Sequence, residues 1–366
     1  MNSLKRLLFA IVLMPSLALA HSHDISTFDI KSYIGFKYFI SSNGGEPIES
    51  YPEAGMLLNW EMTENFHTFV QLGLNRDGVE HGLEHLLIYG FTDYSNTITN
   101  IPLINTMPFR ISVGKLKHEF GLYSDRISNP TTRPGVMPPQ AIYWNALTTT
   151  LTSGYGFKAE IWLGDFNFGY TMDKYITADK KVESLTWTGV DFIDMDPTFG
   201  NHRVINVNWE PDEYDVRMRS SLTSIKLNDD VDTIQMLTIG VEYDNSNWLL
   251  SGEVLGVKSK DLSWLADFSD LRYGLSGTIG KMVMDNMQIY FNYNTYLNSH
   301  IGDMPGVNDN VTDWSDFNIG TVYEIGDLDM RLEVHRIYGG RLQQPKDWDR
   351  TSNSWWLIGT SMTYQF

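Results

Sequence analysis

The chain has 366 residues and a formal net charge of −18, which excludes nucleic acid as its natural partner. It contains no cysteine, so disulfide bonds do not stabilise it. Its mean hydropathy is −0.24, and no apolar run of about 18 residues follows the N-terminal segment, which together exclude a helical membrane protein.

The N-terminal segment has the pattern of a cleaved export signal. A short basic pair precedes an almost continuous apolar stretch over residues 7–19, which ends in Ala18-Leu19-Ala20. The stretch is too short to cross a membrane as a helix, and its small terminal residues are typical of a signal-peptidase site. We therefore predict a cleaved signal peptide at residues 1–20 and a single mature domain at residues 21–366.

The mature sequence divides into segments of about ten residues in which apolar and polar side chains alternate. In the last and clearest segment, one face carries Trp356, Ile358, Met362 and Tyr364, and the other carries Gly359, Ser361 and Thr363. Such alternation favours strands with lipid on one side and a polar lumen on the other. Aromatic residues near the ends of these segments are typical of the interfacial girdles of membrane barrels. They are Trp60, Trp162, Trp209, Trp248, Tyr243, Tyr323 and Tyr364.

Short turns and longer polar connections alternate along the chain, as periplasmic turns and extracellular loops do in outer-membrane barrels. Residues 93–107 are an exception, because they form a long connection where the pattern requires a short turn. Counting the segments predicts an all-β fold, a transmembrane antiparallel β-barrel of about 16 strands. A barrel of that size leaves an aqueous channel, whereas one of about eight strands is filled by side chains.

The longest connection, over residues 116–150, follows the fifth predicted strand. Here the sequence is similar to the strand-to-loop region of proteobacterial porins and porin-like barrels. The similarity is carried by Val113-Gly114-Lys115-Leu116-Lys117, Gly121-Leu122-Tyr123, Thr132-Arg133-Pro134 and Pro138-Pro139-Gln140-Ala141-Ile142-Tyr143-Trp144. In that family the third extracellular loop folds into the barrel and narrows it, so the resemblance implies a long inward-folded third loop. Prolines between positions 130 and 139 stiffen the segment, which lowers the entropy lost when it is held inside a pore.

Charged residues of this segment and of the predicted inward face are candidates for the pore lining and its constriction. They are Lys117, Glu119, Asp125, Arg126 and Arg133 in the segment, and Arg110, Arg217, Arg219 and Arg331 on inward faces of predicted strands. The resemblance implies a transverse field between acidic loop residues and arginines on the opposite wall, and charged rings filter ions by sign. One hypothesis places Glu119 and Asp125 opposite these arginines. In the alternative, the two acids pair locally or lie at the mouth of the loop.

The chain ends on Phe366, with apolar residues two and four positions back. This ending resembles the C-terminal signature that the barrel assembly machinery recognises in Gram-negative outer-membrane proteins. The lipid bilayer and lipopolysaccharide are then expected partners. Most acidic residues fall in predicted loops, where shared Ca²⁺ or Mg²⁺ ions can bridge them to lipopolysaccharide phosphates; the alternative is that these loops are simply solvated. General porins are usually trimers, so the resemblance also implies a homotrimer.

The pattern predicts no cofactor, no catalytic residue and no metal centre. The strongest metal-binding pattern is the mature N-terminus, His21-Ser22-His23. A free amine, two backbone nitrogens and the His23 imidazole can form a square-planar site for Cu²⁺ or Ni²⁺. We assign no biological role to His21 or His23.

Together these features predict an outer-membrane porin that forms a water-filled channel for the passive diffusion of small hydrophilic solutes and ions, with a weak preference for cations. It is not expected to be an enzyme. A substrate-selective channel for sugars, anions or acidic oligomers is the first alternative, and lumen aromatics such as Tyr143, Tyr290 and Tyr296 favour it. The second is a non-conducting structural or interaction barrel that binds a partner through its acidic loops.

Overall fold

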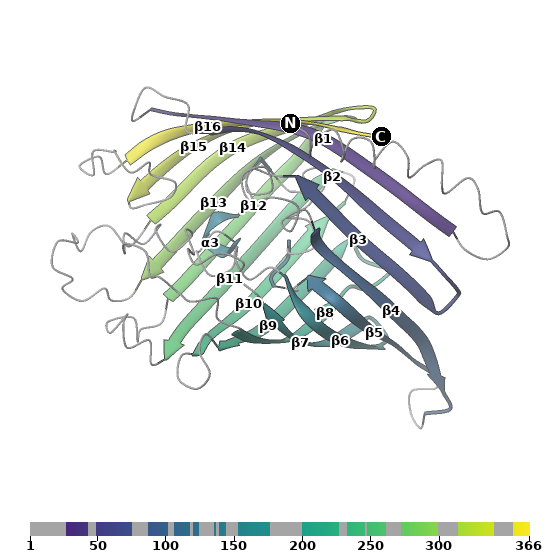
Figure 1. Cartoon of the computed structure of the whole chain (residues 1–366). Helices are drawn as coiled ribbons and strands as arrows, with labels where there is room; N and C mark the ends of the chain where they lie inside the picture. The colour runs from purple at the N-terminus through teal and green to yellow at the C-terminus, as the bar shows by residue number, and fades with distance from the viewer. Residues whose placement is uncertain are drawn as a thin grey trace.

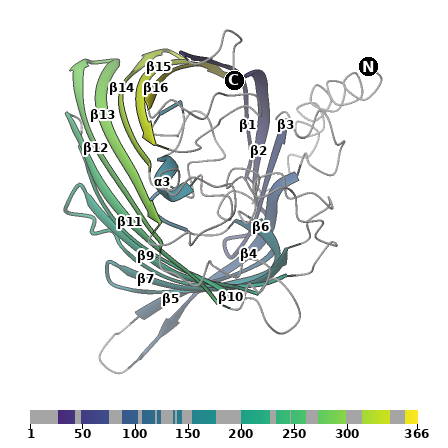
Figure 2. The same cartoon turned by 90° about the vertical axis from the view of Figure 1, so that its left-hand side faces the viewer.

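The computed structural model forms a closed barrel of sixteen antiparallel β-strands, in which each strand pairs with its neighbours in the sequence (Figures 1 and 2). The structure describes residues 27–42, 49–74, 87–101, 106–117, 120–123, 135–136, 139–143, 153–175, 200–226, 233–245, 247–260, 272–298, 314–339 and 354–366. Within these ranges no helix is long and apolar enough to cross a membrane. The predicted fold class and strand number are confirmed, whereas the predicted signal peptide lies outside the described residues.

The strands follow one another around the barrel in chain order. The first eight are β1 (Thr27–Ser41), β2 (Glu49–Glu61), β3 (Phe66–Leu74), β4 (Leu87–Thr99), β5 (Thr106–Lys117), β6 (Ser153–Leu163), β7 (Phe166–Tyr175) and β8 (Gly200–Trp209). The last eight are β9 (Val216–Lys226), β10 (Thr233–Asp244), β11 (Trp248–Lys260), β12 (Arg272–Met284), β13 (Met287–Asn298), β14 (Trp314–Ile325), β15 (Leu328–Gly339) and β16 (Ser354–Gln365). A short helix, α3 (Gln140–Tyr143), lies in the connection between β5 and β6. The shortest strand has 9 residues, and about 9–11 residues suffice for a tilted strand to cross a bilayer core.

The first and last strands close the barrel. β1 pairs with β16 from Tyr33 opposite Gln365 to Ser41 opposite Leu357. Phe366 extends this seam, because its backbone N–H and C=O groups both bond to Ser32 at 2.9 Å. Closure pairs the two edges that an open sheet would expose, and so removes a template for edge-to-edge association.

Short turns lie at one end of the barrel, which we call the short-turn end; the longer connections lie at the opposite, long-connection end. Gly164 and Gly326 begin two of these turns with φ values of 60° and 58°. A positive φ suits the tight turn of a β-hairpin and is disfavoured for residues that carry a Cβ atom. The predicted short turns at 164–165 and 326–327 are therefore confirmed.

The predicted long connection at residues 93–107 is wrong. β4 continues to Thr99 and β5 begins at Thr106, and the two strands pair from Gly90 opposite Lys115 to Thr99 opposite Thr106. This hairpin projects beyond the other turns at the lower right of Figure 1. Its sequence was misleading because polar residues occupy both faces of the projecting part, so the alternation that marks the other strands is lost there.

Alternate residues of each strand face the lumen and the outside. On β16, Trp356, Ile358, Met362 and Tyr364 are exposed on the outer face, as predicted, whereas Trp355 and Leu357 are buried on the inner face. The outer face as a whole carries exposed large apolar side chains, and buried polar and charged side chains point inward. An outer apolar face with a polar interior is the opposite of a soluble protein and is typical of a membrane barrel.

One residue of the predicted aromatic girdle is placed differently. Trp60, Trp248 and Tyr364 are exposed on the outer face near strand ends. Trp162 instead lies on the inward face of β6, where it lines an interior cavity and stacks with an arginine. The prediction failed for Trp162 because position near a strand end does not reveal which face the side chain occupies.

Candidate functional site

The lumen has two walls that differ in what lies against them. Described parts of the connection between β5 and β6 contact β9 to β13, β15 and β16. We call the wall formed by β9–β16 the covered wall. An interior cavity lies against strands β2–β6, which we call the open wall. Figure 2 shows α3 inside the barrel, beside the strands of the covered wall. The two walls together form the candidate site.

Hydrogen bonds hold the connection to three strands of the covered wall. The backbone N–H of Leu122 donates to Glu253 Oε1 on β11 at 2.9 Å, and Arg219 Nη1 on β9 donates to the Leu122 carbonyl at 3.3 Å. Farther along the connection, Arg331 Nη1 on β15 donates to the Gly135 carbonyl at 3.0 Å. Charged wall residues thus satisfy backbone groups of a buried connection, which would otherwise cost free energy as unpaired polar atoms.

Small wall residues make room for the connection. A Cβ atom placed on Gly240 of β10 would meet the side chain of Leu122, and one on Gly274 of β12 would meet the carbonyl oxygen of Ala141 in α3. Leu122 and Ala141 are themselves fully buried. The glycines therefore let the connection approach the wall at backbone contact distance, which a larger side chain at either position would prevent.

Tyr123 adds a further bond between the connection and the covered wall. Its hydroxyl donates to Ser251 Oγ at 2.7 Å. Burial, and then the negative charge of Glu242, raise the pKa of the Tyr123 phenol above its ordinary value. The phenol consequently stays protonated and keeps its role as a hydrogen-bond donor.

Two inward-facing arginines of the covered wall pair with nearby acids. The acid lies on the neighbouring strand for Arg217 and two residues away on the same strand for Arg331. Arg217 Nε lies 2.8 Å from Glu242 Oε1, and Arg331 Nη2 lies 2.6 Å from Asp329 Oδ2. All four side chains are largely buried. Arg331 is also hydrogen-bonded to Asp329 through two of its nitrogens, as a buried charge requires. Arg217 forms an ion pair with Glu242, but its Nε and Nη2 atoms have no hydrogen-bond partner among the described residues.

A chain of buried polar groups crosses β13, β14 and β15 behind the connection. His335 Nδ1 lies 2.9 Å from Asp316 Oδ2, and His335 Nε2 lies 3.2 Å from Glu333 Oε2. The hydroxyl of Tyr290 donates to the other oxygen of Glu333 at 2.6 Å. All four residues are less than 4% exposed. Among the described residues, no group of three or more acidic or histidine side chains has the arrangement of a metal site.

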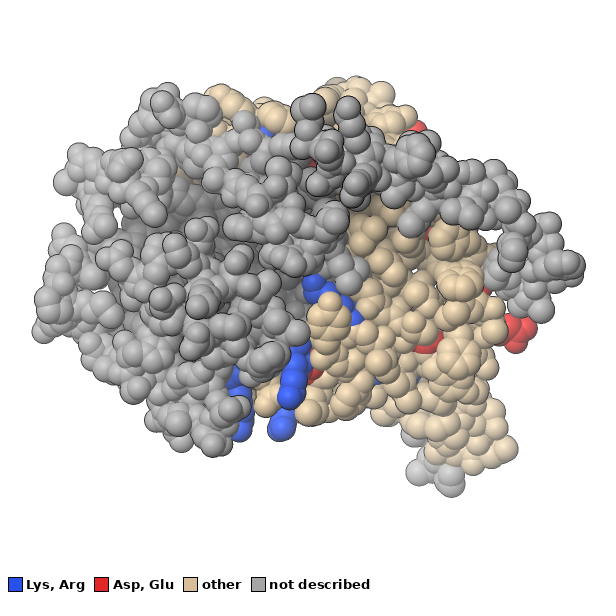
Figure 3. All heavy atoms as spheres, viewed as in Figure 1, with Lys and Arg blue, Asp and Glu red and all other residues tan. Residues whose placement is uncertain are grey.

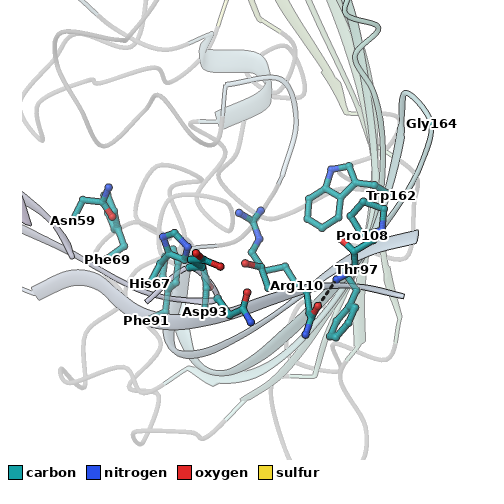
Figure 4. Close-up of a pocket in the computed structure, with 15 residues that line it drawn as sticks. Asn59, His67, Phe69, Phe91, Asp93, Thr97, Pro108, Arg110, Trp162 and Gly164 are labelled. Atoms are coloured by element: carbon teal, nitrogen blue, oxygen red, sulfur yellow. Dashed lines mark hydrogen bonds between the residues drawn. The ribbon is translucent and has the colours of Figure 1, made fainter. Parts of the chain in front are cut away.

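The open wall borders a cavity of about 870 Å³ (Figure 4). Turn residues Glu64 and Gly164 contribute to its lining, so it lies toward the short-turn end. Other lining residues come from strands β2 to β6 and include Asn59, His67, Phe69, Phe91, Asp93, Arg110 and Trp162. Polar groups of both signs and aromatic rings therefore face the same space.

Glu160 organises the charges of the open wall. Its two carboxylate oxygens bind Arg110 Nε at 2.7 Å and Lys158 Nζ at 2.8 Å. The Arg110 guanidinium also lies 5.2 Å from the centroid of the Trp162 ring, within the range of a cation–π contact. The Arg110 side chain remains 38% exposed, so its charge can act on ions in the cavity.

Asp93 is the neighbouring acid on β4. It is largely buried, and its Oδ1 atom has no hydrogen-bond partner among the described residues. Figure 4 shows its carboxylate beside His67 at the bottom of the cavity. The open wall thus presents one exposed cation and one incompletely satisfied acid to the same space.

The structure places part of the predicted site and leaves part outside its described residues. Arg110 faces the open-wall cavity, and Arg217, Arg219 and Arg331 face the covered wall. The side chain of Lys117 and all of Glu119, Asp125, Arg126 and Arg133 lie outside the described residues, as do His21 and His23. The hypothesis that Glu119 and Asp125 face the arginines stays a prediction.

Tyr290 and Tyr296, two of the predicted lumen aromatics, do not together form an exposed surface on which a solute could stack. Tyr290 is buried and bonds to Glu333, and Tyr296 stacks on Trp314 with ring centroids 6.3 Å apart. The side chain of Tyr143 lies outside the described residues. Glu160 and Asp316 were not predicted as site residues. Alternation along their strands places both on the inward face, but their partners lie on neighbouring strands, and strand register cannot be read from the sequence alone.

No protein-family model and no curated protein sequence matches the chain. Its fold nevertheless matches solved structures. OmpF of Salmonella typhi, solved with daunomycin, has a TM-score of 0.60 and 12% identity over 93% of this chain and 97% of that chain. An anion-selective porin from Comamonas acidovorans has a TM-score of 0.57 and 11% identity over 93% and 100%. OmpT, an outer membrane protein of Vibrio cholerae, has a TM-score of 0.57 and 10% identity over 94% and 99%. In fold, the chain is a porin-like β-barrel.

Proposed function

We propose that the chain is a porin of the Gram-negative outer membrane, forming a water-filled channel for the passive diffusion of small hydrophilic solutes and ions. The observation that carries the proposal is the unequal lumen. Its inserted connection contacts the covered wall, while the open wall borders a cavity of about 870 Å³ lined by aromatic rings together with charged and polar groups. A barrel of sixteen strands is wide enough to hold such a channel. The likeness in fold to porins supports this reading.

Outer-membrane location is part of the same proposal. The export-signal pattern of residues 1–20, the apolar outer face and the terminal Phe366 support it, the last as a recognition signal for the barrel assembly machinery. A homotrimer is also proposed. It is supported by OmpT of Vibrio cholerae, which was solved in a trimer form and shares this fold with a TM-score of 0.55.

Charge in the lumen supports a weak preference for cations. Among the described residues, nine carboxylates but four Lys or Arg side chains are buried, and they lie on the inward face. A surplus of fixed negative charge along a pore raises the local concentration of cations. Because most of these acids are paired, the preference is expected to be small.

Single-channel conductance of the refolded mature protein, residues 21–366, in a planar lipid bilayer tests the proposal. Discrete steps that occur in groups of three are expected from an open trimer, and reversal potentials in a salt gradient give the ion preference. Small steps that one solute blocks would instead indicate a selective channel. A protein with the gel mobility of a folded barrel but no steps would contradict the proposal and indicate a plugged barrel.

Neutralising Glu119 and Asp125 together tests the predicted transverse field. If these acids face the arginines, Glu119→Gln with Asp125→Asn lowers cation preference, whereas Asp165→Asn in an exposed turn at the short-turn end leaves the reversal potential unchanged. Unchanged reversal potentials in the double variant would show that the acids pair locally or lie at the mouth of the loop.

A further inference from the structure

Four exposed cationic side chains lie together on the outer face at the long-connection end of the barrel. They are Lys174 on β7, Arg203 on β8, Lys226 on β9 and Lys258 on β11, which we call the basic patch. Figure 3 shows several Lys and Arg side chains on the lower half of the described surface in that view. In a chain with a net charge of −18, such a group of cations on one face calls for an explanation.

Strand register brings the patch together. Lys174 and Lys226 are both opposite Asn201 of β8, one on each side. Because neighbouring strands are about 4.8 Å apart, their Cα atoms are separated by about 10 Å, and Arg203 lies two positions along β8 between them. Lys258 lies in the same row as Arg203, since Arg203 is opposite Ser224, Ser224 opposite Gln235, and Gln235 opposite Lys258. Long flexible side chains at these spacings can converge on one multiply charged group.

The patch lies at the border of the apolar outer face nearest the long-connection end. Toward the middle of the barrel, outward residues one or two positions further along the outer face include Ile205, Leu222 and Val254, all exposed and apolar. Tyr155, which pairs with Lys174, is exposed at the same level. Apolar side chains that give way to tyrosine and cations at one level are expected at a membrane interface, where lipid headgroups begin.

The patch also differs from the cations of the lumen. Lumen residues such as Arg110, Lys158 and Arg331 bind carboxylates of the wall. In the part of the chain that the structure describes, none of the four patch residues forms an ion pair with an acidic side chain. Cations at a headgroup level with no acidic partner among the described residues are suited to phosphate, which they bind through charge-assisted hydrogen bonds.

We propose that the basic patch binds the phosphates of an outer-leaflet lipid headgroup directly, as a docking site for a phosphorylated glycolipid of the lipopolysaccharide type. The proposal rests on the outer-membrane location proposed above, and it adds a site and a ligand chemistry. It differs from bridging through Ca²⁺ or Mg²⁺ at acidic loops, because lysine and arginine need no metal ion to bind phosphate.

Native mass spectrometry of the refolded protein, titrated with bisphosphorylated lipid A in the presence of EDTA, tests the proposal. Replacing all four patch residues by Gln is expected to weaken binding at least about tenfold, and Lys226→Gln alone about threefold to fivefold. Lys281→Gln is the matched control, because Lys281 is also exposed on the outer face but near the short-turn end. It should leave affinity unchanged, and lipid A without phosphates should bind the wild type and the four-residue variant equally.

Several outcomes would overturn the proposal. Unchanged affinity in the four-residue variant would exclude the patch, and loss of wild-type binding in EDTA would assign the lipid to acidic loops with bridging cations. Displacement of lipid A by low millimolar inorganic phosphate would point to a soluble anion instead. If the four-residue variant does not reach folded-barrel gel mobility, Lys226→Gln and Lys281→Gln still decide. Channel conductance is recorded separately, so a failure of the porin proposal is distinguishable from a failure of lipid binding.

Discussion

The covered wall and the open wall have the same strand architecture but serve as different environments. On the covered wall, inward positions such as Leu255, Ile337 and Leu357 are apolar and fully buried. On the open wall, inward positions such as Asp93 and Arg110 are charged and border a cavity. The inner face of one barrel is thus a protein core on one side and a wet surface on the other. Described residues of the connection between β5 and β6 contact the first side, and none of them lines the cavity on the second.

The comparison also separates two uses of charge. Covered-wall charges such as Arg217, Asp316 and His335 are buried against protein and position the connection or each other. On the open wall, Arg110 is paired with Glu160 yet remains 38% exposed. Covered-wall charges should therefore affect stability most, and open-wall charges should affect the passage of ions most.

Removing a partner from the buried chain of the covered wall should give the largest effect. Asp316→Ala leaves His335 without its closer carboxylate, and breaking a buried pair costs about 3–5 kcal/mol. Urea unfolding in detergent micelles measures the loss. Asp29→Ala, which breaks the exposed pair with Lys31, should cost about 1 kcal/mol or less. Equal losses in the two variants would contradict the assignment of His335 and Asp316 to a protein core.

Crowding the contact between the covered wall and α3 should cause the next largest loss of unfolding free energy. Gly274→Val places side-chain atoms where the Ala141 carbonyl lies, and such overpacking costs about 1–3 kcal/mol. We also expect a broader distribution of single-channel step sizes, because α3 loses its fixed position. Gly256→Val is the control, since a Cβ atom there meets nothing within 4 Å. The same narrow steps in both variants would show that α3 does not bound the pore.

Loss of the Tyr123 hydroxyl should have a smaller effect. Tyr123→Phe removes the 2.7 Å bond to Ser251 and should cost about 0.5–1.5 kcal/mol in unfolding free energy. Tyr214→Phe, in an exposed turn, should cost nothing measurable. Denaturant midpoints compare the two variants, and a Tyr123→Phe midpoint equal to that of the wild type would show that the bond contributes no net stability.

The same residue predicts a pH dependence. The raised pKa keeps the folded phenol protonated, whereas the unfolded chain releases its proton above about pH 10. The unfolded state therefore binds fewer protons there, and this contribution lowers stability as pH rises above that value. Wild type should lose more stability than Tyr123→Phe between pH 9 and 11, as measured by urea unfolding; parallel pH profiles would contradict it.

Neutralising an open-wall cation should change the free energy of ion selectivity by only a small amount. It should nevertheless give the clearest change in channel function. Arg110→Gln removes an exposed positive charge from the cavity and should raise cation preference by about 0.5–1 kcal/mol, near the Coulomb energy of unit charges in water. Arg217→Gln, on the covered wall, should shift the reversal potential less, because Arg217 is buried against Glu242. A larger shift for Arg217 would mean that ions pass along the covered wall.

Much of the fold was predictable because alternation is a local property of each strand. The outward face of Trp356, Ile358 and Tyr364, and the inward phase of Arg217 and Arg331, follow from the period of two. The projecting ends of β4 and β5 were not predicted. Asn96, Thr97 and Thr99 are polar on both faces of the strand, so apolar and polar residues do not alternate there. Their pairing depends on the partner strand rather than on their own sequence.

The candidate site was predictable only in part. The inward arginines were identified, but Glu160 and Asp316 were not expected as partners of Arg110 and His335. Each pair joins strands whose register is set by turns and connections far from the residues themselves. The apolar inward residues of the covered wall, such as Leu255 and Ile337, were also unexpected, because a polar lumen is the rule for a membrane barrel.

The seam between β1 and β16 has a kinetic consequence. Its paired residues, such as Tyr33 and Gln365, are separated by nearly the whole chain, so this contact has the highest loop-closure cost in the barrel. We therefore expect ring closure to be a late step of folding. Until the seam closes, the sheet has two edges with unpaired backbone N–H and C=O groups, which can pair with other chains. Assembly must therefore be assisted, or faster than aggregation.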